Sequence, residues 1–79
     1  MRLDKFLKVS RIIKRRSVAN TACSSGHVEV NGKVAKAGTV LKIGDEITIT
    51  FNDNSNKYRV LDLKEHVGKD DSSSLYEVI

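Results

Sequence analysis

The chain has 79 residues, of which 39% are hydrophobic and 30% charged, with a formal net charge of +4 and a single cysteine. A domain of this size buries only about 60 to 65% of the surface of its unfolded chain, which leaves little room for a deep enzyme pocket. One cysteine excludes an intrachain disulfide and a cysteine-cluster metal site, and the mixture of charged and apolar residues at the start predicts a cytoplasmic protein without signal peptide or membrane span.

Residues 3–9 are predicted to form a helix. At about 100° per residue, Leu3, Phe6 and Leu7 share one face, and the basic side chains of the segment lie on the opposite face. Asp4 is expected to stabilise the start of this helix through the helix dipole. The apolar stripe then loses its phase, so we expect two short helices rather than one long one.

The second helix is predicted over about residues 16–24. Its small apolar side chains, expected in the core, are Val18, Ala19, Ala22 and Cys23. Ser17 or a neighbouring residue can cap its N-terminus, and Arg15 and Arg16 stand beside the free backbone N–H groups there, an arrangement that suits a phosphate. Gly26 is expected to end the helix in the left-handed conformation.

The rest of the chain is predicted to form short strands. Residues 28–30 alternate in polarity, and Asn31-Gly32 favours a two-residue hairpin turn of type I′. A half-buried strand is expected at 47–51, a polar turn at 52–56, and a further strand at 57–63. We therefore predict an α+β fold, with two short N-terminal helices packed on a small, mostly antiparallel sheet of four or five strands.

The end of the chain differs in composition from the part before it. Residues 67–79 contain an acidic, serine-rich segment followed by a short apolar end, and they offer few core residues. We predict a domain over 1–66 and a loose C-terminal tail over 67–79. Removal of residues 69–79 is accordingly expected to leave the fold intact.

The charges are segregated along the chain. Residues 1–44 contain ten Lys and Arg and two acidic residues, whereas residues 45–79 contain four Lys and Arg and eight acidic residues. Such a distribution favours a polyanionic partner, above all nucleic acid, because phosphate contacts release condensed counterions. The alternative is a solvated basic surface that only keeps the protein soluble.

Two short basic helices, an Asn-Gly hairpin and a strand that begins "GDEI" occur together in residues 2–49. In this combination the segment resembles the S4 RNA-binding domain, also called S-four, whose fold contains the alpha-L motif. Because the module fills nearly the whole chain, it is similar to the stand-alone S4 proteins, the RqcP family of bacterial ribosome-associated quality control and the small ribosome-binding heat-shock protein.

This resemblance implies a monomeric RNA-binding protein that is not an enzyme, needs no cofactor and does not bind membranes. The implied partners are large-subunit rRNA, a stranded peptidyl-tRNA, and RqcH on the obstructed large subunit, where alanine tails are added to stalled chains. The RNA contacts that the resemblance implies are Arg2, Lys5, Lys8, Arg11, Lys14, Arg15, Arg16, Asn31, Gly32 and Lys33. Residues 36–38 depart from the family, whose members commonly have a proline there, so this loop is expected to be less rigid.

Other functions fit the residues less well. His27 and His66 lack further ligands at metal-binding spacing, and the adjacent acids Asp45 and Glu46 point to opposite sides of a strand. With Phe51 expected in the core, no aromatic platform for base stacking is predicted. Two alternatives stay open: a DNA-binding helix-turn-helix regulator, and a protein-interaction module that does not bind nucleic acid.

Overall fold

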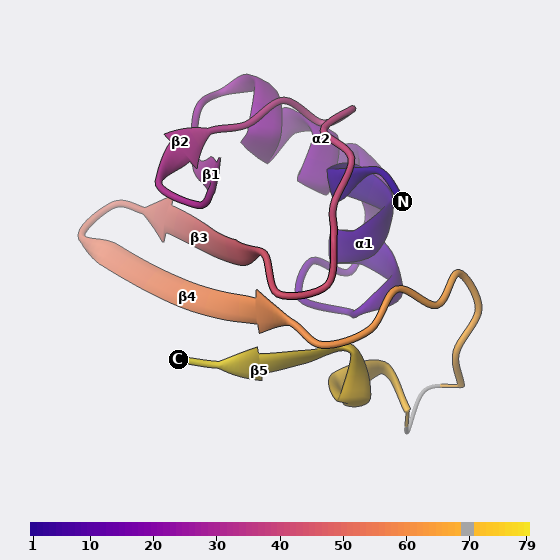
Figure 1. Ribbon diagram of the computed structural model, residues 1–79. Helices are drawn as coiled ribbons and strands as arrows, with labels where there is room; N and C mark the ends of the chain where they lie inside the picture. The colour runs from indigo at the N-terminus through magenta and orange to yellow at the C-terminus, as the bar shows by residue number, and fades with distance from the viewer. Residues whose placement is uncertain (69–70) are drawn as a thin grey trace.

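The computed structural model describes residues 1–68 and 71–79 and contains helices at the start of the chain followed by a sheet (Figure 1). The helices are α1 (Leu3–Val9) and α2 (Arg16–Ser24), and a short 3-10 helix, η1 (Ser72–Leu75), lies near the end. The strands are β1 (Val28–Val30), β2 (Lys33–Val34), β3 (Glu46–Phe51), β4 (Asn54–Val60) and β5 (Tyr76–Val78). They form one sheet in the order β2-β1-β3-β4-β5 with antiparallel pairing throughout, which confirms the predicted fold class.

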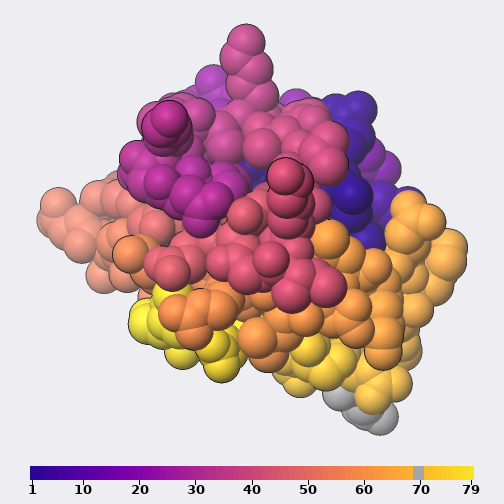
Figure 2. Space-filling view, viewed as in Figure 1, coloured from indigo at the N-terminus to yellow at the C-terminus, as the bar shows by residue number. Residues whose placement is uncertain are grey.

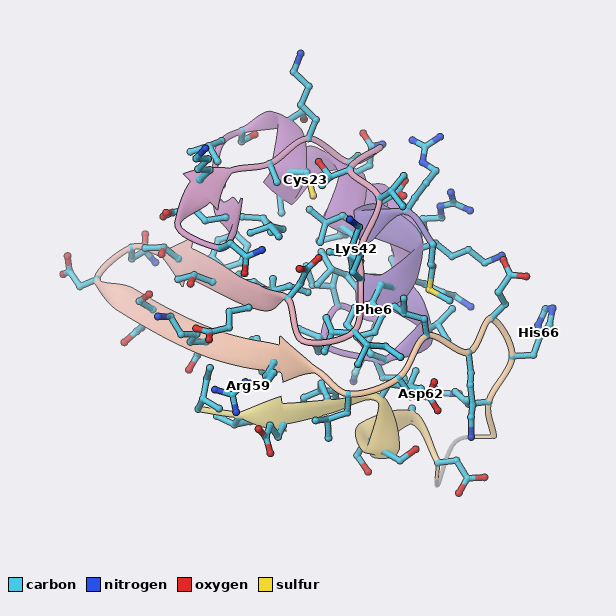
Figure 3. The ribbon with its side chains drawn as sticks, in the orientation of Figure 1. Phe6, Cys23, Lys42, Arg59, Asp62 and His66 are labelled. Atoms are coloured by element: carbon cyan, nitrogen blue, oxygen red, sulfur yellow. The ribbon has the colours of Figure 1, made fainter. Side chains whose placement is uncertain are left out.

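The two helices begin and end where the sequence predicts. Leu3, Phe6 and Leu7 of α1 are fully buried, and Figure 3 shows Phe6 pointing from α1 toward the sheet. The small side of α2 packs in the core as expected, except that Val18 is 49% exposed. The prediction for Val18 is wrong because this residue lies about 100° around the helix from Ala19, at the edge of the packed side.

The N-terminus of α2 is not capped as predicted. Arg15 occupies the N-cap position, and no side chain accepts a hydrogen bond there. Ser17 lies inside the helix instead, where its carbonyl oxygen accepts a hydrogen bond from the Thr21 hydroxyl at 3.0 Å. An arginine side chain has no acceptor atom, so the first backbone N–H groups of α2 have no capping side chain to donate to. At the other end, Gly26 has φ of +79°, which confirms the predicted left-handed stop.

The β1–β2 turn is the predicted Asn-Gly hairpin, with φ of 53° at Asn31 and 83° at Gly32. The Asn31 side chain also fastens this turn to the start of β3. Its Nδ2 donates to Asp45 Oδ1 at 3.1 Å, and its Oδ1 accepts from the backbone N–H of Glu46 at 3.0 Å. Asp45 also closes the turn before β3, where its Oδ2 accepts a hydrogen bond from the Lys42 backbone N–H at 2.8 Å, and its bond to Asn31 was not predicted from the sequence.

Replacing Asn31 by alanine is expected to lower the free energy of unfolding by about 1 to 3 kcal/mol, because two hydrogen bonds and a residue suited to positive φ are lost together. Asn31→Gly should recover only the part due to backbone conformation. Urea denaturation of both variants, with Lys33→Ala as a control in the same hairpin, measures the two contributions. Equal stability of Asn31→Ala and the control would show that the side-chain bonds contribute nothing.

The β3–β4 hairpin is longer than expected. The turn is confined to residues 52 and 53, and β4 starts at Asn54, within the segment predicted as a turn. Phe51 was expected in the core, but it is 43% exposed and its ring centroid lies 4.9 Å from that of His27. The prediction is wrong because Phe51 lies at the open edge of the core, where it lines a hollow of about 330 Å³ together with His27 and Val18 of α2.

The C-terminal segment is not the loose tail that its composition predicts. Leu75 is fully buried, and β5 pairs with β4 through Tyr58 opposite Val78 and Val60 opposite Tyr76. The backbone N–H of Leu61 donates to the Leu75 carbonyl at 2.8 Å. The 3-10 helix η1 places Leu75 in the core, so this one buried leucine attaches a segment that also contains acidic residues and serines to the sheet. Lys69 and Asp70, which also fall in the predicted tail, lie outside the described residues.

Candidate nucleic-acid interface

Seven cations gather on α1, on the loop that follows it and at the start of α2. We call this set the helical basic surface; it consists of Arg2, Lys5, Lys8, Arg11, Lys14, Arg15 and Arg16. Each side chain is exposed, except that Lys5 is partly buried. In the view of Figure 2, the first part of the chain lies at the top of the molecule and the last part at the bottom. The charge asymmetry of the sequence is therefore an asymmetry of the surface as well.

The start of α1 holds a buried carboxylate beneath two of these cations. Asp4 is only 2% exposed. Its Oδ1 lies 3.4 Å from Nε of Arg2, and its Oδ2 accepts a hydrogen bond from Nε of Arg16 at 3.3 Å. The backbone N–H of Lys5 also donates to Oδ1 at 2.9 Å. Sequence reasoning assigned Asp4 to the helix dipole and missed this arrangement, although a lone acid among seven cations was a sign of it.

Asp4 stays ionised in this environment. Burial alone would raise the pKa of Asp4, but the hydrogen bond and charge of Arg16, the Lys5 N–H and the charge of Arg2 together lower it below its ordinary value. The same carboxylate adds to the effect of burial on Cys23, whose thiol pKa is raised. Cys23 is thus a buried thiol of the core, as its place on the apolar side of α2 predicts.

The loop between the helices presents its cations around a polar hollow. Arg11 has φ of +63°, a conformation that turns the chain sharply after α1, and Ile13 N–H donates back to the Leu7 carbonyl at 3.0 Å. The hollow has a volume of about 160 Å³, and its lining residues are Lys8, Val9, Arg11, Lys14, Glu65, His66 and Val67. Figure 3 shows His66 at the outer edge of the molecule. The segment after β4 therefore supplies one wall of a hollow whose other wall is cationic.

Besides Arg2 and Arg16, a third cation of the helical basic surface is already paired. Lys5 Nζ lies 2.8 Å from Oε1 of Glu65, and the Lys5 side chain is 30% exposed. The hydrogen bond and charge of Lys5 lower the pKa of the Glu65 carboxyl. An incoming phosphate would have to compete with Glu65 for Lys5, whereas Lys8, Lys14 and Arg15 form no ion pair in the described part of the chain.

The hairpin tip is not brought together with the helical cations. In Figure 1 the β1–β2 hairpin lies at the left of the molecule and α1 at the right. Both hydrogen-bonding atoms of the Asn31 amide are already bound to Asp45 and Glu46, which leaves Lys33 as the exposed cation of the tip. The sequence-based set of RNA contacts thus divides into two separate surfaces.

Among residues 1–68 and 71–79, no group of three or more histidine, cysteine or acidic side chains could hold a metal ion. No helix in that part of the chain is long and apolar enough to cross a membrane.

Comparison with known proteins bears on the resemblance inferred from the sequence. The S4 domain model matches residues 1–47. A protein of Halalkalibacterium halodurans named RQC P-site tRNA stabilizing factor is 55% identical over 78 residues, which cover 99% of this chain and 89% of that protein. The protein of the same name from Streptococcus pneumoniae is 47% identical over 79 residues, which cover 100% of this chain and 90% of that protein.

A solved structure supports the same relationship. The trimeric structure of heat shock protein 15 from Vibrio cholerae superposes on this fold with a TM-score of 0.90 at 29% identity, covering 100% of this chain and 81% of that one. The likeness includes the strands beyond residue 47 that the family model does not reach. The chain therefore belongs to the S4 domain family and, within it, to the family of RQC P-site tRNA stabilizing factors.

Proposed function

We propose that this protein is a non-enzymatic RNA-binding component of ribosome-associated quality control. It binds large-subunit rRNA together with a stranded peptidyl-tRNA on the obstructed large subunit, in the cytoplasm, and supports RqcH-dependent alanine tailing. The observation that carries the proposal is the helical basic surface, seven cations within the first sixteen residues of a chain whose relatives are named for stabilising a P-site tRNA.

The geometry favours recognition of phosphates over recognition of bases. The cations project from α1, the loop and the first turn of α2, and the uncapped N–H groups of α2 lie beside Arg15 and Arg16. Phosphate contacts fix the position and orientation of a protein on RNA without reading sequence. A small protein of this kind acts as an electrostatic clamp, and we propose that it does so as a monomer between rRNA and tRNA.

The affinity of the protein for purified large subunits is expected to fall steeply with salt, because several phosphates are engaged at once. For contacts with six to ten phosphates, affinity falls by about 10³ to 10⁵ between 50 and 200 mM salt. Co-sedimentation at a series of salt concentrations gives the slope of log affinity against log salt. A flat response would contradict the proposal.

The same assay separates the two alternative functions. A helix-turn-helix regulator would bind duplex DNA in preference to large subunits, and a protein-interaction module would bind neither in a salt-dependent way. The RqcH part of the proposal is tested by alanine-tail synthesis on obstructed large subunits with and without this protein. Tailing at the same rate in its absence would contradict that part while leaving RNA binding untouched.

A further inference from the structure

Asp4 is out of place on a surface that binds a polyanion. It is the only acidic residue among the first 28, and its carboxylate contacts Arg2 and Arg16. It is also 2% exposed, although burial of a carboxylate is costly unless its oxygens are paired. The neighbouring core positions Leu3 and Leu7 show that this end of α1 packs with apolar residues. Packing alone therefore does not explain why a charged residue, Asp4, occupies this buried position.

The contacts of Asp4 indicate that reason. Arg2 and Arg16 lie fourteen positions apart in sequence, on either side of α1, and Asp4 binds one with each carboxylate oxygen. Both contacts are made through Nε, which leaves the terminal nitrogens of each guanidinium for other partners. The Arg2 and Arg16 side chains remain 55% and 49% exposed. We call these two residues the arginine pair.

The loop after β2 approaches one member of the arginine pair, Arg2, from a second direction. The backbone N–H groups of Leu3 and Asp4 donate to the carbonyls of Thr39 and Ala37 at 2.8 and 3.1 Å. A Cβ built on Gly38 would lie 3.7 Å from a terminal nitrogen of Arg2, so the loop backbone passes close to this guanidinium. Arg2 is thus confined between the Asp4 carboxylate and the loop.

We propose that Asp4 is a positioning residue for RNA binding, which holds the inner edges of Arg2 and Arg16 so that their outer edges meet the phosphate backbone together. The inference rests on the proposed RNA-binding function and adds a role to the one acid within the surface. Free arginine side chains lose rotamer freedom when they bind a phosphate. The arginine pair has already lost part of that freedom, so less is lost on binding.

The direction in which one substitution changes the affinity for RNA distinguishes this positioning role from a simple effect of charge. Asp4→Asn raises the net charge by one and keeps the size of the side chain, so if Asp4 acts only as a charge, the variant binds RNA more tightly. Positioning predicts the opposite. Glu29→Gln is the matched control, since it makes the same change of charge in the same half of the chain, at a residue without an ion pair among those described.

The experiment measures the affinity of wild type, Asp4→Asn and Glu29→Gln for purified large ribosomal subunits, at one salt concentration and at a temperature where all three are folded. Asp4→Asn is expected to bind at least about fivefold more weakly than wild type, and the control as tightly or more tightly. Asp4→Asn binding as tightly as the control would overturn the positioning role. Wild type that fails to bind would overturn the proposed function itself.

A second measurement requires no variant and so does not depend on whether Asp4→Asn folds. In the free wild-type protein, the side-chain Nε–H groups of Arg2 and Arg16 are expected to give separate NMR signals that exchange slowly with water. The Nε–H of Arg15, which has no ion pair in the described structure, should exchange rapidly with water. If the Nε–H groups of Arg2 and Arg16 exchange with water as fast as that of Arg15, the proposal is overturned.

Discussion

Deletion of residues 72–79 is expected to abolish cooperative folding. The deletion removes η1, strand β5 and the fully buried Leu75, and it leaves β4 paired with β3 on one side only. Small domains are stable by only about 5 to 15 kcal/mol, and the loss of one buried leucine side chain costs about 2 to 5 kcal/mol before the lost pairing is counted. The truncated chain should therefore lack a sharp urea transition.

A point substitution tests the contribution of Leu75 in a full-length chain. Leu75→Ala is expected to lower the free energy of unfolding by about 2 to 5 kcal/mol. Val78→Ala in the neighbouring strand is the control, because Val78 is 68% exposed and should have little effect. Urea denaturation followed by circular dichroism measures both. A truncated protein that unfolds with the wild-type midpoint would show that the segment contributes nothing to the fold.

Arg16→Ala is expected to weaken binding to large subunits by about 1.5 to 3 kcal/mol, because a charge-assisted phosphate contact at the start of α2 is lost. Arg16→Lys should recover only part of the loss, since an ammonium group keeps the charge but not the planar fork. Arg15→Ala is the comparison: it removes the same charge from the adjacent position of the helical basic surface, but Arg15 does not contact Asp4 in the described structure, so a smaller loss of binding is expected. Co-sedimentation with large subunits measures all three affinities.

The structure alters what is expected for the stability of the Arg16 variant. Arg16 lies away from the packed side of α2, and this position alone would predict no loss of stability on substitution. Its Nε binds the buried Asp4 carboxylate, so Arg16→Ala also removes one partner of that carboxylate and lowers stability. Melting curves must therefore accompany the binding data. Arg16→Ala binding like wild type, in a fully folded sample, would show that Arg16 does not contact the RNA.

The sequence was sufficient for features that local physics determines. Helix bounds followed from the phase of apolar residues, and the first hairpin followed from Asn31-Gly32, whose positive φ angles few other residues adopt readily. The S4 resemblance rested on the same local features in their order along the chain. Each of these depends on residues close together in sequence.

Three misses depend on residues far apart in sequence. Leu75 is buried because β5 returns to β4, and composition averaged over the tail does not reveal that return. Phe51 is exposed because it lies at the open edge of the core, although its alternation with threonine continues unchanged. Asp4 meets Arg16 only after α2 folds back on α1. Tertiary placement decided each outcome, and neither propensity nor periodicity reports it.

The most direct test of the central proposal compares two charge-reversed variants for binding to large subunits that carry peptidyl-tRNA. Lys8→Glu/Lys14→Glu reverses two unpaired cations of the helical basic surface, and Lys42→Glu/Lys57→Glu makes the same change of net charge outside the predicted RNA contacts. If the helical basic surface holds the RNA, the first variant loses binding at about 150 mM salt while the control keeps most of it. Equal losses in the two variants would contradict the account, because net charge rather than this surface would then determine binding.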